Sequence, residues 1–338
     1  MRGTTRTRRP VRAPWRRTAL AATLATVLLA SLAGCGLTSG SPLADDVGPG
    51  SIGQGLPLKG AQLTVTSKNF SENIVLGQIM GLAFKAAGAE VLDRTDIQGS
   101  IGARAAITSG SADAMYEYTG TAWITYMGHD KPLPDPAAQW RAVAEADRAN
   151  GVTWLAPASL NNTYALALNQ ANERRYRTRT LSDVARLSRT RPQAVTLCVE
   201  SEFAARDDGL SGMARAYGMN VPAKRVQKMD GGIIYTQVSG GNSCTYGEVF
   251  TTDGRIKAMD LVVMDDDKRF FPNYNAAPEI NSKAIAKYPA IKDVLDPITA
   301  KLTNDVAREL NAEVDVRGRD PRDVAKRWLV EEGFITKG

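Results

Sequence analysis

Residues 116–121 read Tyr-Glu-Tyr-Thr-Gly-Thr, a stretch in which a strand pattern runs directly into a turn pattern. Alternating aromatic and β-branched residues favour a strand, and the glycine favours a turn. Side chains at the end of such a strand can point into a cleft, but an ordinary core strand with its turn fits the same letters. The residues on either side decide between these two interpretations.

Strand and helix patterns alternate on both sides of this stretch. A strand at 63–68 precedes a helix at 72–87, for which Ser71 is the expected N-cap. Further strands are expected at 90–97, 114–118, 153–156, 164–168, 194–200, 226–229, 247–250 and 261–264. Further helices are expected at 102–109, 136–149, 181–187, 210–217, 233–238, 281–288, 291–302, 304–310 and 322–331. This alternation predicts an α/β chain of two similar lobes with short connections.

The composition is that of a soluble globular protein, with 43% hydrophobic and 23% charged residues among 338. The net charge of +6 is unevenly distributed, because residues 1–35 contain seven arginines and no acid. Removing that segment leaves a charge of −1. A basic surface for nucleic acid is therefore not expected in the mature chain.

Residues 1–35 have the pattern of a secretory signal: an arginine-rich start, a charge-free run at 19–34 and small residues at the end. The final Leu32-Ala33-Gly34-Cys35 resembles the bacterial lipobox, which implies cleavage before Cys35 and its lipidation. A plain secretory signal with an incidental cysteine is the alternative. Lipid chains on Cys35 would anchor the protein to the outer face of the bacterial cell membrane. Residues 36–60, rich in Gly, Ser and Pro, are expected to form a flexible tether.

Cys198 and Cys244 are the two cysteines that remain after such a cleavage. In an exported protein, a disulfide is the simplest expectation for them, and two free buried thiols are the alternative. His129 is the single histidine, so the sequence lacks the residues from which zinc sites and histidine-dependent catalytic sites are built. We therefore expect no metal, no cofactor and no enzyme activity. A tethered two-lobed protein of this kind suggests a receptor whose lobes close on a ligand.

Five stretches, at 67–72, 116–121, 161–167, 251–256 and 266–274, together resemble the substrate-binding proteins of ABC transporters for glycine betaine, choline and related quaternary amines. The resemblance implies a two-lobed periplasmic-binding-protein fold of type II with the ligand cleft between the lobes. Lobe 1 would comprise 61–159 and 265–338, and lobe 2 would comprise 160–264, joined by two crossings. It also implies a monomer that delivers its ligand to a membrane permease driven by an ATPase.

The same resemblance implies an aromatic cage formed by Tyr118, Tyr164 and Tyr274, with Phe250 at a fourth position where relatives usually have tyrosine. A trimethylammonium group has no N–H to donate, so a protein holds it through the faces of aromatic rings, at about 1–2 kcal/mol per desolvated ring. Phenylalanine keeps the ring face and loses the hydroxyl. A functional but differently tuned cage is therefore expected.

Glycine betaine also carries a carboxylate, for which the resemblance implies donors. Lys68 matches the family position that approaches this group, and Arg206 is the candidate from the other lobe. Thr121 can donate its hydroxyl. Ser100, just before an expected helix, is a further possible contact through its hydroxyl or through helix N-terminal amides.

Three other functions remain open at this point. The first is a receptor for choline or another quaternary amine without a carboxylate. The second is an exported hydrolase that uses acids such as Glu117, Asp253 and Asp266, although no nucleophile motif accompanies them. The third is a receptor that serves a sensor and not a transporter.

Overall fold

The computed structural model describes residues 40–44, 46–241 and 243–338. Cys35 and the expected signal segment lie outside these residues. Within them the strands are β1 (Ser41–Pro42), β2 (Val47–Pro49), β3 (Gln62–Lys68), β4 (Glu90–Ile97), β5 (Ala114–Tyr118), β6 (Val152–Trp154), β7 (Tyr164–Asn169), β8 (Leu197–Val199), β9 (Val226–Lys228), β10 (Tyr246–Phe250), β11 (Leu261–Val263), β12 (Ala276–Asn281) and β13 (Ile335–Lys337).

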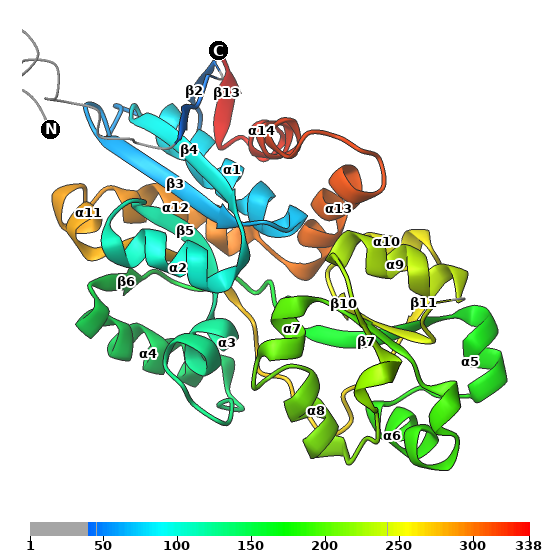
Figure 1. Cartoon of the computed structure of the whole chain (residues 1–338). Helices are drawn as coiled ribbons and strands as arrows, with labels where there is room; N and C mark the ends of the chain where they lie inside the picture. The colour runs from blue at the N-terminus through cyan, green and yellow to red at the C-terminus, as the bar shows by residue number, and fades with distance from the viewer. Residues whose placement is uncertain (1–39, 45, 242) are drawn as a thin grey trace, which may run out of the picture. The chain divides into compact units, whose positions relative to one another are not determined.

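The helices of the described residues surround these strands (Figure 1). They are α1 (Ser71–Ala86), α2 (Gly99–Ser109), α3 (Thr119–Thr121), α4 (Pro136–Asp147), α5 (Gln170–Tyr176), α6 (Leu181–Thr190), α7 (Ser201–Ala205), α8 (Leu210–Tyr217), α9 (Gly231–Gly240), α10 (Arg255–Ala258), α11 (Ser282–Lys287), α12 (Ile291–Lys301), α13 (Asn304–Asp315) and α14 (Pro321–Glu331). A π-helical turn, Ala122–Tyr126, continues α3.

Two mixed sheets form two α/β lobes, as the sequence pattern predicts. The first has the order β1-β4-β3-β5-β12-β6, in which β3 pairs in parallel with β4 and β5 while β12 is antiparallel to β5 and β6. The second has the order β11-β7-β10-β8-β9. Figure 1 shows the first lobe in blue to teal with orange and red, and the second in green to yellow.

The chain passes between the sheets twice, through residues 155–163 and 264–275, and these crossings lie side by side. Asn161 and Asn275 form an isolated antiparallel bridge between them, and the backbone N–H of Asn162 donates to the carbonyl of Tyr274 at 3.1 Å. The first sheet thus contains strands from both ends of the chain, and the second contains the middle. The exact lobe limits expected from sequence remain predictions.

Helix ends are defined by side-chain caps at several places. Asp135 accepts from the backbone N–H of Ala138 at the start of α4, and Thr180 and Asp183 form a reciprocal capping box on α6. The predicted cap of α1 is wrong. Phe70 is the N-cap residue, and Ser71 is the first helical residue, whose hydroxyl donates to Asp315 of α13 at 2.5 Å.

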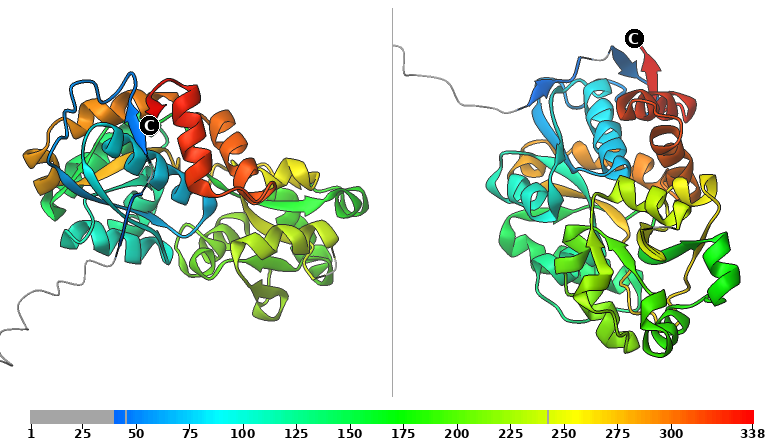
Figure 2. Two further views of the ribbon diagram at one scale, coloured as in Figure 1. Left: turned by 90° about the horizontal axis from the view of Figure 1, so that it is seen from above. Right: turned by 45° about the vertical axis from the view of Figure 1, so that its right-hand side comes forward.

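The described part of the predicted tether is ordered against the first lobe, which corrects the flexible segment expected at 36–60. β1 pairs with β4, and β2 pairs with the C-terminal β13. Leu43, Ile52 and Leu58 are buried in the main core. The segment is ordered because these widely spaced apolar side chains pack against the lobe. The glycines and prolines between them led to the prediction of a linker. The views in Figure 2 show α14 beside α1, and the two helices are in contact.

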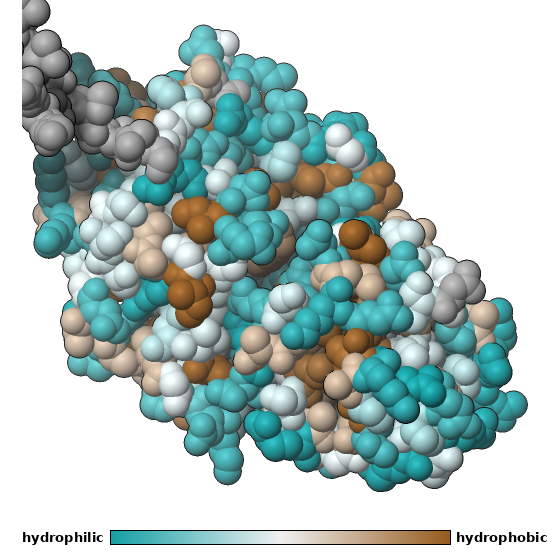
Figure 3. All heavy atoms as spheres, viewed as in Figure 1, coloured by the Kyte–Doolittle hydropathy of each residue, from teal (hydrophilic) through white to brown (hydrophobic). Residues whose placement is uncertain are grey.

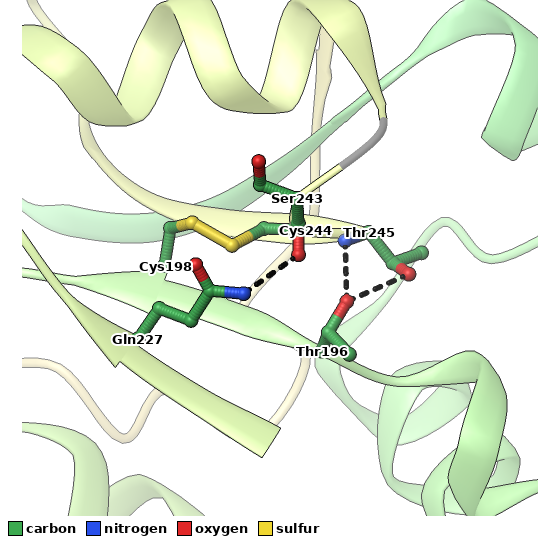
Figure 4. Close-up of a disulfide and its surroundings, with 6 residues drawn as sticks. All are labelled: Thr196, Cys198, Gln227, Ser243, Cys244 and Thr245. Carbon is green, nitrogen blue, oxygen red and sulfur yellow. Dashed lines mark hydrogen bonds between the residues drawn. A yellow bond between two sulfur atoms is a disulfide. The ribbon is translucent and has the colours of Figure 1, made fainter. Parts of the chain in front are cut away.

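A disulfide joins Cys198 on β8 to Cys244, just before β10, with a Cα–Cα distance of 5.7 Å (Figure 4). Around it, Thr196 accepts from the backbone N–H of Thr245 at 2.9 Å, and Gln227 donates to the carbonyl of Ser243 at 3.1 Å. Both cysteines lie in the second lobe. The cross-link therefore stiffens one lobe and leaves the crossings between lobes unconstrained.

The surface of the described residues has no single large apolar area on the face seen in Figure 3, where hydrophobic residues form small groups among hydrophilic ones. Larger contiguous patches typically mark interaction surfaces. Within the residues that the structure describes, none of the helices is long and apolar enough to span a membrane.

Candidate functional site

Five aromatic side chains line one cavity of about 50 Å³ between the lobes. Tyr118 is at the end of β5, Tyr164 at the start of β7 and Phe250 at the end of β10, while Tyr274 belongs to the second crossing. Phe70, at the entrance to α1, is the fifth. The structure thus brings together the four rings expected from sequence and adds one that the sequence argument did not assign.

The rings contact one another in stacked, tilted and edge-on arrangements. The Tyr164 centroid lies 5.2 Å from that of Phe250 and 5.3 Å from that of Tyr274, which stands edge-on to it. Phe70 stacks on Phe250 at 5.2 Å and lies 6.0 Å from Tyr118. Phe70 could have been anticipated, because it lies inside the 67–72 stretch that carries the family resemblance.

Gly120 explains why a glycine follows the tyrosines of the opening stretch. A Cβ at this position would lie 2.7 Å from Cδ1 of Tyr274 and 2.9 Å from the carbonyl oxygen of Asn273. The backbone here approaches the ring of Tyr274 so closely that only glycine fits without displacement. The turn after Tyr118 therefore packs its backbone directly against the ring of Tyr274.

Glu72, on the first turn of α1, holds the hydroxyl of Tyr118 from behind the cavity. Its carboxylate accepts from Tyr118 at 2.7 Å, from Asn162 at 2.9 Å, from Thr252 at 2.5 Å and from Asn311 at 3.0 Å. Burial raises the pKa of Glu72, and the four hydrogen bonds oppose that rise. Sequence reasoning missed this residue, since an acid in the first turn of a helix is usually a solvated one.

Lys68 is buried at the end of β3 and is paired within the protein. Its Nζ donates to Glu117 at 2.6 Å and lies 4.6 Å from the ring centroid of Tyr118. Glu117 also accepts from the hydroxyl of Tyr126 at 2.5 Å. The lysine therefore reaches the cavity as an ion pair, which differs from the free donor that the carboxylate role suggests.

Arg206, just after α7, is also paired within the protein. Its Nε and Nη2 donate to the two oxygens of Asp208 at 2.7 and 2.6 Å, a bidentate arrangement. Nη2 also lies 3.5 Å from the hydroxyl of Thr121 in the other lobe. Asp208 in turn accepts from the hydroxyl of Tyr274 at 2.7 Å. Arg206, Asp208 and Tyr274 thus form one connected group.

Ser100, at the start of α2, faces an acid from the opposite lobe. Its hydroxyl donates to Oε1 of Glu202 at 2.5 Å, and its backbone N–H donates to Oε2 at 3.1 Å. Glu202, on α7, also accepts from Arg206 at 3.2 Å. The structure therefore places Ser100 at the site, with a protein carboxylate on the donors that sequence reasoning assigned to the ligand.

The acids considered for hydrolysis have structural partners. Glu117 pairs with Lys68, and Asp253 pairs with Arg255 at 2.5 Å. Asp266 accepts from the backbone N–H groups of Phe270 and Phe271. These contacts give each acid a role in holding the local fold.

A second buried charge cluster lies beside Tyr126 and gives a pH prediction. Arg104 forms an ion pair with Asp147 and donates a hydrogen bond to Glu279, and its guanidinium lies 5.0 Å from the ring of Tyr126. Burial raises the pKa of Glu279 to about 8, although Arg104 opposes the rise. The folded chain therefore keeps a proton on Glu279 that the unfolded chain releases near pH 4.5.

Because the unfolded state binds fewer protons in this window, stability should fall between about pH 4.5 and 8, by at most about 1.4 kcal/mol per pH unit from this group. Glu279→Gln should remove that part of the slope. Denaturant unfolding of wild type and variant at several pH values between 5 and 8 measures it. Glu145→Gln, at an exposed position, is the control. Parallel stability–pH curves for wild type and Glu279→Gln would contradict the prediction.

Comparison with known proteins places this chain in a family. The substrate binding domain of the ABC-type glycine betaine transport system matches residues 61–331. A glycine-betaine-binding protein of Pseudomonas aeruginosa is 36% identical over 281 residues, which are 82% of this chain and 89% of that protein. An ergothioneine transport permease/binding protein of Helicobacter pylori is 30% identical over 273 residues, 80% of this chain and 48% of that protein.

Solved structures agree on the fold. Apo YehZ of Escherichia coli superposes with a TM-score of 0.61 at 25% identity, covering 81% of this chain and 99% of that one. A crystal structure of a glycine betaine/carnitine/choline ABC transporter gives 0.66 at 24% identity, covering 80% and 99%. The two-lobed type II periplasmic-binding-protein fold expected from sequence is confirmed. On sequence and fold together, the chain belongs to the family of substrate-binding domains of ABC-type glycine betaine transport systems.

Proposed function

We propose that this protein is the extracytoplasmic receptor of an ABC importer, and that it captures glycine betaine or a similar quaternary amine between its lobes. The observation that carries the proposal is the convergence of five aromatic rings on one small cavity. Delivery to a membrane permease driven by an ATPase, and anchoring through a lipid on Cys35, belong to the same proposal.

The cavity suits a cation without hydrogen-bond donors. Ring faces attract diffuse positive charge at about 1–2 kcal/mol per ring when desolvated, so several rings together give useful affinity. The cations near the rings would repel such a ligand if they were unpaired. Each is neutralised, Lys68 by Glu117 and Arg206 by Asp208, which removes that repulsion.

Choline or another quaternary amine without a carboxylate is the second candidate ligand, and a specific observation favours it. The donors that a ligand's carboxylate needs, on Ser100 and Arg206, are both engaged by Glu202. The glycine-betaine-binding relatives support the first candidate. The two candidates use the same cage and differ only in the group attached to the ammonium.

Calorimetric titration of the purified chain tests the proposal, with glycine betaine, choline and 3,3-dimethylbutan-1-ol as ligands. The last compound has the shape of choline without its charge. We expect at least one of the cations to bind, and the neutral compound to bind at least about tenfold more weakly, since it forms no cation–π contact. Equal binding of the neutral compound, or no binding of either quaternary amine, would refute the proposed function.

A further inference from the structure

Glu202 lies where the two lobes and three cavities meet. It lines the aromatic cavity and both neighbouring ones, and its side chain is 32% exposed. Its two oxygens take the hydroxyl and the backbone N–H of Ser100 in lobe 1 and the guanidinium of Arg206 in lobe 2. A hydroxyl, a helix N-terminal amide and a guanidinium that point at one carboxylate form an anion-binding subsite.

The volume of the aromatic cavity limits which part of a ligand it can hold. A volume of about 50 Å³ holds about four water-sized groups, at ~10–15 Å³ for each. A trimethylammonium head has four heavy atoms. The rest of a zwitterion such as glycine betaine needs further space and donors, and two candidate donors, Ser100 on the cavity wall and Arg206, already donate to Glu202.

The charges around the cavity agree with this. Lys68 and Arg206 face three carboxylates, those of Glu117, Asp208 and Glu202, and a further acid, Glu200, lines the cavity. Burial alone would raise the pKa of Glu202, but Lys68, Ser100 and Arg206 hold it below its ordinary value, so this group is charged at neutral pH. The surroundings favour a cation and disfavour a second anion.

We propose that Glu202 is the specificity-determining residue of the cleft, because its carboxylate occupies the subsite that the carboxylate of a zwitterionic ligand must enter. Quaternary amines without a carboxylate leave Glu202 in place and gain from its charge. Zwitterions must displace it from Ser100 and Arg206. The inference rests on the proposed function, since it concerns which quaternary amine the same cage accepts.

Glu202→Gln tests the inference, because glutamine is nearly isosteric and removes the charge. The measured quantity is the ratio of Kd for choline to Kd for glycine betaine. We expect this ratio to rise about tenfold or more relative to wild type, since a charge-assisted contact is gained by the zwitterion alone. An unchanged or smaller ratio would overturn the inference.

Glu200→Gln is the matched control. Glu200 has the same chemistry and lines the same cavity, but it caps the backbone N–H of Gly231 and not the Ser100 donors. Loss of its charge should weaken the binding of choline and of glycine betaine to a similar extent and leave the Kd ratio within about threefold. A ratio change equal to that of Glu202→Gln would reduce the effect to general electrostatics and overturn the subsite.

Glu202→Ala gives a second readout that does not depend on the glutamine variant. It leaves the subsite open, so acetate at tens of millimolar should weaken glycine betaine binding to this variant and leave choline binding unweakened. Acetate that affects both ligands equally, against a chloride control of the same ionic strength, contradicts the inference. If neither quaternary amine binds to wild type or variants that unfold cooperatively, the proposed function itself fails, and the inference with it.

Discussion

Replacing Tyr164 with alanine should weaken binding of the quaternary amine by about 10- to 100-fold, because one cation–π contact is worth about 1–2 kcal/mol and each 1.4 kcal/mol is tenfold. The upper part of this range arises because Tyr164 also positions other rings. Its centroid lies within 5.3 Å of those of Phe250, Tyr274 and Phe203. The alanine variant would lose one ring face for the ligand and also the contacts that hold Phe250 and Tyr274 in position.

Tyr164→Phe is the matched control, because it keeps the ring and removes only the hydroxyl. We expect its Kd, from the same calorimetric titration, to stay within about threefold of wild type, since the ring face supplies the attraction. Equal losses in the alanine and phenylalanine variants would place the contribution on the hydroxyl and contradict a cage. Thermal unfolding of both variants separates loss of binding from loss of fold.

The positions of the rings were the most predictable part of the site. The family resemblance named Tyr118, Tyr164 and Phe250, and each is at the end of a strand. Tyr118 ends β5 of the first sheet, while Tyr164 and Phe250 are paired at one edge of the second. Their role in ligand binding remains a prediction. The partner of Lys68 could not be anticipated, because Glu117 is 49 residues away in sequence and local patterns contain no information on such pairs. The partners of Arg206 are local, because Asp208 is two residues away and Glu202 four, so the sequence did contain a signal for them.

The strand β12 shows where sequence patterns fail for the fold. It lies between β5 and β6 in the first sheet, yet Pro278 and Glu279 argue against an inner strand. The structure accommodates Glu279 through Arg104 on α2, a contact 175 residues away along the chain. Alternation of α and β was therefore sufficient to predict two lobes and insufficient to find this strand.

Glu72 connects the aromatic site to the junction of the lobes. The four groups that donate to it come from β5, from the first crossing, from the residues after β10 and from α13. Three of these belong to lobe 1 or the crossing, and Thr252 follows a strand of lobe 2. One buried carboxylate thus fixes the direction of the Tyr118 hydroxyl and ties both lobes to α1.

Glu72→Ala should therefore lower the free energy of unfolding by about 3 kcal/mol or more, since each buried donor left without a partner costs about 1–3 kcal/mol. The donors affected are those of Tyr118, Asn162, Thr252 and Asn311. Urea unfolding followed by circular dichroism measures the change. Because burial raises the pKa of Glu72, its stabilising effect should decline as pH rises, as for Glu279.

Glu72→Gln separates the hydrogen bonds from the charge. Glutamine keeps the size and one acceptor. Tyr118 and Thr252 donate to different oxygens of Glu72, so the one hydroxyl that faces the amide can turn to accept from it while the other keeps donating to the remaining oxygen. We expect a loss of only about 1 kcal/mol in stability, with a clear loss of affinity if the buried charge behind Tyr118 contributes to holding the cation. A glutamine variant as unstable as the alanine variant would show that these neutral groups need the carboxylate itself, and that the charge of Glu72 helps to stabilise the fold.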